Sequence, residues 1–336
     1  MSRDAFSEMN SGRVIEDLQQ KLRAVLDPLM RGQRYALLDF PDHPNVGDSA
    51  IWLGESAYFR ARGDKPCLIT RTEVPGADEL SAADTIFLHG GGNFGDLWPA
   101  HQHLRIEVMK RAKGTPIVQL PQSIHFGTEA LIPETSRAIH QHGDVTLMVR
   151  DQPSFDFASK HFGCKIVLAP DMAFCMGAQQ PHPADVNRFC LLRTDHETTG
   201  KFSAADVPAG AVVEDWLSEP VADVRRARLW GLVTHALSAP AAKRLAVFDA
   251  AAAHRVRRGS RALSRGRVVI TDRLHGHILC CLLGIPHVAL DNSYRKIGNF
   301  IDSWTYKADF VRTATTLEEA TRLADMLHEQ FGGGRA

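Results

Sequence analysis

Residues 85–98, TIFLHGGGNFGDLW, place a short apolar run directly before a glycine-rich segment. The spacing G-x-G-x-x-G that starts at Gly90 is that of a dinucleotide-binding turn, where the glycines allow a tight turn and a close approach of backbone to pyrophosphate. Such a site also needs an acidic residue about 20 residues later, at the end of the next strand. The next apolar run, at 116–120, is followed by PQS and no carboxylate. We therefore do not expect a nicotinamide site.

Two other interpretations of the glycine segment remain open. Glycines often serve a purely structural turn, because they adopt backbone conformations that other residues avoid. His89, Asn93 and Asp96, however, add polar side chains where the apolar run ends, and this favours a binding loop.

Short runs rich in Val, Ile and Leu recur along the chain, and each is followed by a polar or glycine loop and a helical pattern. This alternation predicts parallel sheets covered by helices on both faces, with ligands bound at the carboxyl ends of the strands. The runs are YALLDF (35–40), TIFLH (85–89), PIVQL (116–120), VTLMVR (145–150), KIVLAP (165–170), RFCLLRTDHE (188–197), RVVIT (267–271) and PHVALDN (286–292).

One segment interrupts this alternation. Residues 175–187, CMGAQQPHPADVN, are short of apolar residues and contain two prolines, which is typical of a linker. We predict an α/β protein with two Rossmann-like domains, 1–178 and 187–336, that face a shared cleft. We expect the last helix, within 315–331, to pack back on the first domain.

The composition is that of a soluble globular protein, with 336 residues, 44% hydrophobic and 23% charged. Lys plus Arg and Asp plus Glu number 39 each, so the charge balance gives no indication of nucleic-acid binding. The N-terminus lacks the apolar core of a signal peptide, and the longest apolar run, 277–290, is too short to span a bilayer. We therefore expect a cytoplasmic protein. The six cysteines show no CxxC spacing and predict buried, reduced thiols.

The densest group of reactive side chains lies in VVITDRLHGHILCCLLGIP, residues 268–286. A β-branched strand ends there, and Asp272, Arg273, His275 and His277 follow before an apolar helix. A helix N-terminus favours anions, an arginine forms a fork for phosphate or carboxylate, and a histidine changes charge near neutral pH. The alternative is that Arg273 pairs with Asp272 while the histidines only pack.

Other candidates stand at the ends of other predicted strands. Arg193 is expected to face the cleft, or else to pair with Asp195 or Glu197. In HPNVGDSAIW (43–52), Asp48 is either a ligand or a helix N-cap. HExxH, Asp-x-Asp, clustered Cys and His, and Gly-x-Ser-x-Gly are all missing, so neither a metal centre nor a serine hydrolase is expected. An anion site of Arg, His and backbone N–H groups remains.

Together these segments resemble the polysaccharide pyruvyltransferase family, from about residue 36 to 305. The resemblance implies a glycosyltransferase-B-like fold and an enzyme that takes phosphoenolpyruvate and builds a pyruvate ketal on a sugar of a bacterial exopolysaccharide. Because the metal-binding motifs are missing, we expect no metal and no other cofactor. The segments that carry it are HPNVGDSAIW, FLHGGGNFGDLW, PQSI, RDQPSFDFA, APDMAF, LLRTDHE and TDRLHGHILCCLLGIPHVALDN.

The resemblance also implies site residues. The second domain is expected to bind phosphoenolpyruvate and the first domain to bind the acceptor. We predict His275 as the general acid that protonates the methylene carbon, with Asp96 or His125 acting on the sugar hydroxyls. The predicted phosphoenolpyruvate contacts are Arg193, Arg273, Leu274, His275 and His277. The predicted acceptor or loop contacts are Asn45, Asp48, Gly91, Gly92, Asn93, Gln122 and Ser123.

Acceptors in this family are commonly lipid-linked oligosaccharides. The basic segment 254–267, HRVRRGSRALSRGR, is therefore expected to contact the inner face of the membrane. The alternative is a solvated face of a helix, and Gly259 weakens the prediction of a helix there. Two rival functions remain: a nucleotide-sugar glycosyltransferase of the same fold, and a protein that binds carbohydrate or anions without catalysis.

Overall fold

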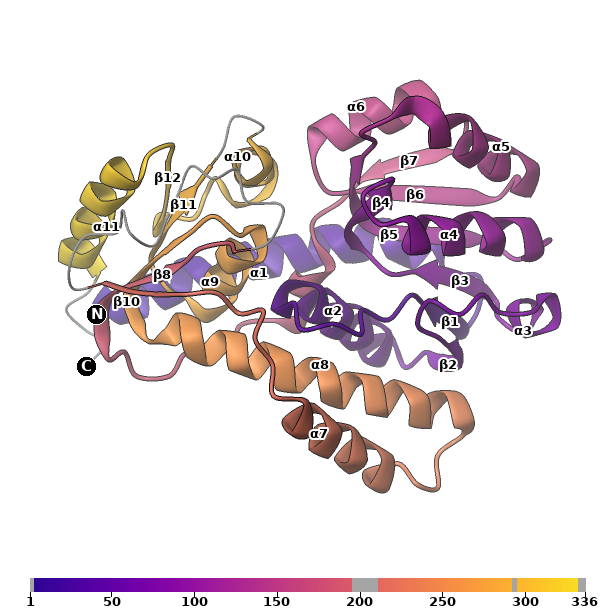
Figure 1. The fold of residues 1–336 in the computed structure, drawn as a ribbon, viewed down its shortest axis with the longest axis horizontal. Coiled ribbons are helices and arrows are strands. Elements are labelled where there is room, and N and C mark those ends of the chain that lie inside the picture. The colour runs from indigo at the N-terminus through magenta and orange to yellow at the C-terminus, as the bar shows by residue number, and fades with distance from the viewer. Residues whose placement is uncertain (1–2, 195–210, 292–294, 332–336) are drawn as a thin grey trace.

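The computed structural model describes residues 3–194, 211–291 and 295–331, and its strands form two sheets in which all the pairs are parallel (Figure 1). The first sheet has the order β2-β1-β3-β5-β6-β7, and β4 pairs with the outer part of β5. Its strands are β1 (Arg34–Leu38), β2 (Lys65–Ile69), β3 (Thr85–Leu88), β4 (Gly91–Gly95), β5 (Ile117–His125), β6 (Val145–Val149) and β7 (Lys165–Leu168).

The second sheet has the order β12-β11-β10-β8-β9. Its strands are β8 (Val186–Leu191), β9 (Ala211–Glu214), β10 (Gly266–Thr271), β11 (His287–Leu290) and β12 (Val311–Ala314). β1 in the first sheet and β10 in the second sheet each lie between two parallel neighbours. The loops that follow these two strands therefore lie where doubly wound sheets bind ligands.

Helices cover the sheets and connect successive strands. The first half contains α2 (Val46–Arg62), α3 (Ala77–Ser81), α4 (Pro99–Arg111), α5 (Ile132–His142) and α6 (Gln152–His161), with short helices η1 (Asp27–Leu29), η2 (Glu129–Leu131) and η3 (Met172–Met176). The second half contains α7 (Val221–Thr234), α8 (Pro240–Ser264), α9 (Leu274–Leu283), α10 (Lys296–Phe300), η5 (Ile301–Thr305) and α11 (Leu317–Phe331).

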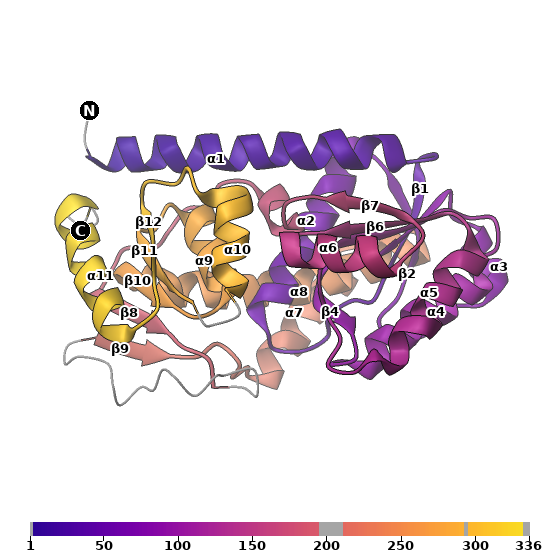
Figure 2. The ribbon, with the colours of Figure 1, turned by 90° about the horizontal axis from the view of Figure 1, so that it is seen from above.

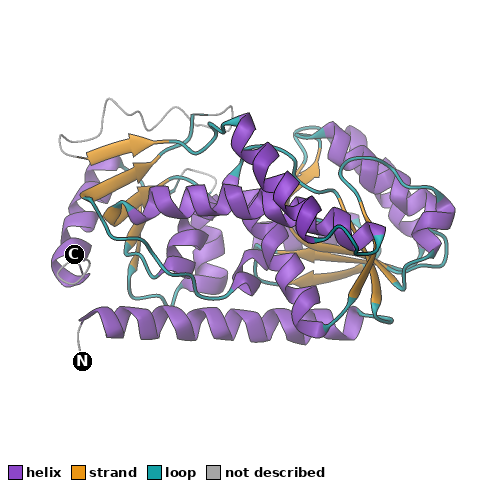
Figure 3. Ribbon diagram, turned by 90° about the horizontal axis from the view of Figure 1, so that it is seen from below, coloured by secondary structure: helices purple, strands orange, loops and turns teal. Residues whose placement is uncertain are grey.

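Two long helices, α1 (Arg3–Leu26) and α8, run along both sheets (Figures 2 and 3). The Ser11 hydroxyl of α1 donates to the carbonyl of Cys281 in α9, while Gln19 donates to the carbonyl of Phe174 in η3. In α8, the Asp249 carboxylate accepts from Trp52 and Ser56 of α2. Buried apolar residues of the second sheet and of one face of the first sheet consequently share one core cluster, which includes Leu37 and Ile270. A separate cluster, which includes Leu38 and Ile86, lies on the other face of the first sheet.

The predicted parallel α/β alternation is confirmed, since every quoted apolar run forms a strand. Four strands were not predicted: β2, β4, β9 and β12. β4 was not predicted because its glycines give no apolar pattern. This strand forms through pairing with the distant β5 and not through local apolar character. Residues 177–185 contain no helix or strand, as the linker prediction expects. The last helix packs on β10, β11 and β12 and also contacts α1.

All six cysteines are free thiols, as predicted, but only Cys190, Cys280 and Cys281 are buried; the other three are partly exposed. Among the described residues, no helix combines the length and the apolar character needed to cross a membrane.

Candidate active site

His275 lies on the first turn of α9, directly after β10, and it faces the first turn of α2. A Cβ atom placed on Gly47 would lie 2.5 Å from His275 Nδ1, so only glycine allows this contact between the helix ends. The other ring nitrogen, Nε2, points to Asp171 Oδ2 at 3.4 Å. Burial and two close neighbours therefore fix the orientation of the imidazole.

Asp171 is fully buried at the N-terminus of η3, where it caps the backbone N–H of Ala173. Its Oδ2 accepts a 2.6 Å hydrogen bond from Arg150 Nη1, next to the contact with His275. Burial tends to raise the pKa of Asp171, but His275 and Arg150 outweigh it and hold that pKa well below its usual range. Asp171 is thus a buried carboxylate that contacts both Arg150 and His275.

Arg150 extends the same network into the first sheet. Its Nε donates to Ser123 Oγ at 3.0 Å, and this hydroxyl in turn donates to Asp151 Oδ2 at 2.6 Å. A Cβ on Gly92 would lie 3.4 Å from Arg150 Nη2. The predicted site residue Ser123 is therefore a support for Arg150, and Gly92 provides space beside the guanidinium.

Asp48 lies on the first turn of α2, next to Gly47. The N-cap of this helix is Asn45, whose Oδ1 accepts from the N–H of Gly47, and not Asp48 as one sequence interpretation had it. Asn45 also donates to Asp48 Oδ2 at 2.8 Å. Burial raises the pKa of Asp48, but the positive charge available on His43, His275 and His89 outweighs burial, so the net pKa is lowered. Asp48 is therefore ionised near neutral pH.

Arg273 is buried at the N-cap of α9, and its partner is Asp215, after β9. Nε and Nη2 each donate to one oxygen of that carboxylate, both at 2.7 Å, and the guanidinium lies 5.8 Å from the Trp216 ring centre. The expected alternative pairing with Asp272 is wrong. Asp215 and Trp216 instead hold the arginine fork in a fixed plane.

Asp272 and Arg193 meet through the backbone, because the N–H of Arg193 donates to Asp272 Oδ1 at 2.9 Å. Burial raises the pKa of Asp272 to about 6. Arg193 is partly buried at the end of β8, next to the N-cap of α9. Its expected alternative partners, Asp195 and Glu197, lie outside the described residues. The fold thus gathers Arg193, Asp272 and Arg273 at one edge of the second sheet.

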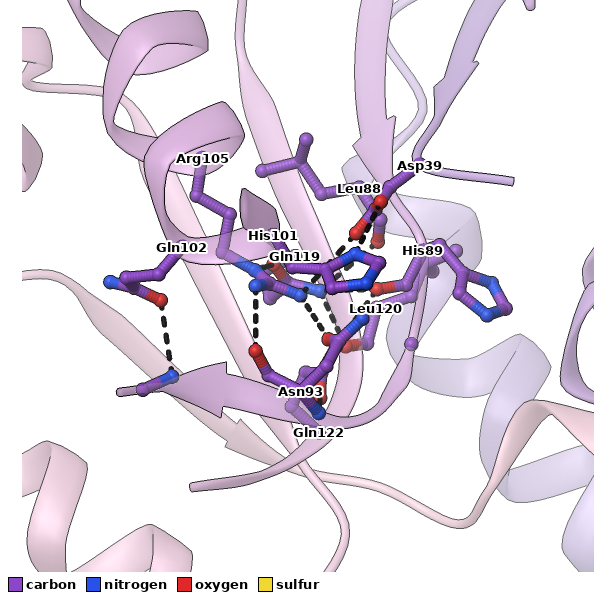
Figure 4. A network of polar contacts seen from close by, with 12 residues as sticks. Asp39, Leu88, His89, Asn93, His101, Gln102, Arg105, Gln119, Leu120 and Gln122 are labelled. Carbon is purple, nitrogen blue, oxygen red and sulfur yellow. Dashed lines mark hydrogen bonds and ion pairs between the residues drawn. The ribbon is translucent and has the colours of Figure 1, made fainter. Parts of the chain in front are cut away.

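The glycine segment forms strand β4 and not a phosphate-binding turn, because a network around Arg105 holds it against β5 (Figure 4). Arg105 donates to Gln119 Oε1 at 2.7 Å and to the carbonyl of Asn93 at 2.9 Å. Gln122 donates to Asn93 Oδ1 and to the carbonyl of His89, both at 2.9 Å. The predicted loop residues Asn93 and Gln122 therefore bind each other and shape the edge of the sheet.

Asp96 and His125 come together at the ends of β4 and β5. A Cβ on Gly127 would lie 3.7 Å from both Asp96 oxygens and 3.9 Å from His125 Nε2. Both Asp96 oxygens accept backbone hydrogen bonds, from Gly127 and Thr128, and the bond from Gly127 is the main cause of its lowered pKa. Asp96 anchors this turn, whereas the exposed His125 side chain faces solvent.

Comparison with known proteins adds to this geometry. The family model described as polysaccharide pyruvyl transferase matches residues 45–294. Pyruvyl transferase 1 of Schizosaccharomyces pombe is 32% identical over 322 residues, which cover 88% of this chain and 76% of that protein. This chain belongs to the polysaccharide pyruvyl transferase family. The resemblance predicted from the sequence is thereby confirmed.

Other comparisons agree with this family membership. EpsO of Bacillus subtilis is 31% identical over 88% of this chain and 93% of its own length. The crystal structure of a functionally uncharacterized protein from Klebsiella pneumoniae aligns with a TM-score of 0.59 at 18% identity. That alignment covers 89% of this chain and 99% of the other, and it shows a shared fold alone.

In this member of the family, His277 lies apart from the other predicted phosphoenolpyruvate contacts. It is fully buried; its Nδ1 lies 2.7 Å from His287 Nε2, and its Nε2 lies 2.9 Å from Thr305 Oγ1. His287 Nδ1 is 2.8 Å from the carbonyl of Ile285 and must donate there, so His277 Nδ1 must donate to His287. Burial lowers the pKa of both rings, that of His287 to about 4. We therefore remove His277 from the predicted substrate contacts.

Cys281 lies beside this histidine pair, which corrects the expectation that the chain has no Cys and His cluster. Ligand atoms of His277, Cys281 and His287 lie within 4.8 Å of one another. The ring nitrogens, however, are already used in a neutral chain of hydrogen bonds, and 2.7 Å between them is a hydrogen-bond distance. The cluster fits a structural connection between α9, β11 and η5 better than a metal site.

The basic segment 254–267 is helical through most of its length and only partly solvated. Gly259 does not break α8; a Cβ there would lie 2.4 Å from Val46, so this glycine allows α8 to pack closely on α2. Arg255 binds Glu219 at 2.9 Å, and Arg258 donates to the carbonyls of Pro44 and Trp216, both at 2.8 Å. Arg255 and Arg258 therefore hold the loop before α2, while Arg257 and Arg261 are exposed, as the solvated-face alternative expects.

Three residues of the site were not predicted from the sequence of this family member: Arg150, Asp171 and Asp215. Arg150 and Asp171 lie within RDQPSFDFA and APDMAF, two segments that carry the family resemblance, and their position at strand ends could have indicated them. Glu55 was not predicted either, because it lies within helix α2 and not at the end of a strand. Its carboxylate lies 2.8 Å from His89 Nδ1 and accepts from the N–H of Gly90, so it orients the start of the glycine segment.

Proposed function

We propose that this chain transfers pyruvate from phosphoenolpyruvate to two hydroxyl groups of one sugar in an exopolysaccharide repeat unit, forming a ketal and releasing phosphate. The observation that supports it most is the position of His275. Its imidazole comes from the second sheet and lies between Gly47 and Asp171 of the first half, with Nε2 3.4 Å from the Asp171 carboxylate that orients it. Such a group is placed to exchange a proton with a substrate.

In the proposed reaction, His275 gives its proton to the methylene carbon of phosphoenolpyruvate, which leaves a cationic centre at the adjacent carbon. The first sugar hydroxyl forms a C–O bond to that carbon, and its proton passes to a carboxylate. We assign this base role to Asp48, because it is ionised and lies close to His275. The second hydroxyl then forms a C–O bond as the C–O bond to phosphate breaks, and its proton leaves with the phosphate.

Arg273 and Arg193 are the proposed contacts for the phosphate and carboxylate of phosphoenolpyruvate, with Leu274 beside them on the first turn of α9. Asp215 and Trp216 orient Arg273. His125 is the proposed contact for the acceptor, because its side chain is exposed next to the turn that Asp96 anchors. Gly91 belongs to the same edge, since a Cβ there would lie 3.5 Å from Asp48 Oδ1.

We further propose a glycosyltransferase-B-like arrangement in which residues 1–178 and 187–336 form the two domains and the substrates bind between them. The separation of the strands into two sheets, residues 34–168 and 186–314, supports this division. The packing that α1, α2, α8 and α9 share between the two sheets favours closure by loops over a large rotation of the two sheets. The reaction chemistry proposed here uses no cofactor.

The test is phosphate release from phosphoenolpyruvate, with and without a lipid-linked or aryl glycoside acceptor and without added metal. Release that depends on the acceptor, together with a new ketal methyl signal in the proton NMR spectrum of the product, supports the proposal. No release with any acceptor, alongside binding of a nucleotide sugar, would favour glycosyl transfer on the same fold.

A further inference from the structure

Helix α7 and its connection to α8 expose an unusual number of apolar side chains. The described residues include ten exposed large hydrophobic side chains, and six of them lie between 221 and 237. Trp230 is 70% exposed and Leu237 is fully exposed. We call this surface the α7 apolar patch. Its residues are Val221, Leu229, Trp230, Leu232, Val233 and Leu237.

Packing explains how this helix is held without burying the patch. Gly231 and Val224 are the buried residues of α7, and a Cβ on Gly231 would lie 2.6 Å from the Ala246 carbonyl of α8. The two helices thus meet along a narrow line of small residues, and the hairpin projects from one side of the molecule (Figure 1). A solvated helix face normally carries polar residues, so an apolar face at this position indicates a partner.

The charges around the patch define the kind of partner. Residues 221–244 contain five Lys or Arg and one Asp, in a chain whose net charge is zero. Arg225, Lys243 and Arg257 form no ion pair with any other described residue, and the Arg226 side chain is 80% exposed. A cavity of about 400 Å³ between α7 and α8 is lined by Trp230 and His254 and by three charged residues, Asp223, Arg226 and Arg257. Two arginines against one carboxylate leave a net positive charge there, which a phosphate group matches.

We propose that the α7 apolar patch docks on an anionic lipid bilayer. Trp and Leu side chains would enter the interface, and the surrounding arginines would contact lipid phosphates, a combination typical of peripheral membrane helices. A second copy of this chain is a poorer occupant, because a two-fold interface would bring the same cations of both copies together.

The hairpin is also connected to the candidate active site. Arg255 of α8 donates to the Pro41 carbonyl, Arg228 of α7 pairs with Asp42, and Arg258 donates to the Pro44 carbonyl. These bonds hold the loop that ends in Asn45 and leads into α2. Docking of the hairpin would therefore place the loop before α2, and with it His275, close to the membrane surface. The benefit to catalysis rests on the proposed function.

The experiment is vesicle flotation of the full chain, with phosphatidylcholine vesicles and with vesicles that also contain phosphatidylglycerol. We expect binding to the anionic vesicles that weakens with salt. L229S/W230S should reduce the bound-to-free ratio by about tenfold or more, because two large side chains no longer enter the interface. R225E/R226E should remove the preference for phosphatidylglycerol. Met326→Ser, on the exposed face of α11, is the matched control and should bind as the native chain does.

Phosphate release with a water-soluble acceptor is measured for every variant. It should remain unchanged, which separates loss of docking from loss of folding or of the proposed activity. Equal flotation of the native chain and L229S/W230S would overturn the proposal. So would a concentration-dependent dimer that L229S/W230S abolishes in a chain that does not float, because the patch would then be an interface between copies.

Discussion

Nε2 of His275 lies 3.4 Å from Oδ2 of Asp171, so the first turn of α9 in the second half reaches a carboxylate that follows β7 in the first. Arg150 donates a 2.6 Å hydrogen bond to the same oxygen. Trp304 of η5 donates to the Arg150 carbonyl at 2.8 Å, and adds a second connection between the halves. The orientation of the proposed acid therefore depends on the buried Asp171–Arg150 pair.

Asp171→Asn should destabilise the fold, because it leaves the buried Arg150 guanidinium without a counter-charge. We expect a loss of about 3–5 kcal/mol in the free energy of unfolding, measured by urea denaturation at neutral pH. Asp325→Asn removes an exposed partner of Arg188 and is the control, with an expected loss of about 1 kcal/mol or less. Equal losses in the two variants would show that the buried pair has no special weight.

His275→Asn should keep the fold and lose the proposed activity. Removal of a general acid typically lowers turnover by about 10²–10⁴-fold, and acceptor-dependent phosphate release measures it directly. His103→Asn, on the exposed side of α4, should leave release unchanged. If His275→Asn turned over phosphoenolpyruvate at close to the native rate, His275 could not be the acid.

Gly47→Ala should disturb the same imidazole without removing it. The added methyl group would lie 2.5–2.7 Å from ring and Cβ atoms of His275, so the ring or the start of α2 must move. We expect kcat to fall at least about tenfold, since small displacements at a reacting group are costly.

Gly12→Ala is the matched control for this substitution. A Cβ on Gly12, within helix α1, meets no atom within 4 Å. Alanine is the better helix former, so this variant should gain about 0.5–1 kcal/mol in stability and keep native kcat. Equal kcat for both glycine variants would contradict the contact between Gly47 and His275.

Asp272 should make stability depend on pH in a defined window. Burial raises its pKa from the usual 3.8 to about 6, so the folded state favours the protonated carboxyl group. Its stabilising contribution is complete below about pH 4 and is lost as the pH rises through about 6. Relative to the native chain, Asp272→Asn should therefore gain up to about 3 kcal/mol between pH 4 and pH 7, measured by urea denaturation. A difference that does not change with pH would mean that Asp272 is not buried as described.

Local patterns predicted most strands and the ends where the site residues lie. A run such as VTLMVR is buried on both faces of a sheet, so its apolar composition indicates a strand wherever it occurs. The polar residues after such runs, among them Asp48, Arg193, Arg273 and His275, could be predicted for the same reason. In contrast, β4 has only one large apolar side chain, Phe94, and β9 has an apolar run of only three residues, so both become strands through pairing with β5 and β8.

The partners of each side chain could not be read from these patterns. His275 and His277 are two residues apart on one helix, yet one faces Asp171 and the other His287, because α9 is covered by different elements on its two sides. Asn93 and Gln122 looked like ligand contacts and instead bind each other beside Arg105.

The order of apolar runs and polar loops thus determined the parallel α/β sheets and the sheet edge that carries the site residues. The reason is that the burial pattern of one strand or helix depends on residues a few positions away in the sequence. Which carboxylate meets which cation was decided by tertiary packing. Asp171 and His275 are 104 positions apart in the numbering, and only the contact between α2, η3 and α9 places their side chains 3.4 Å apart. Electrostatic pairing depends on distance in space, and the sequence of a single chain does not state that distance.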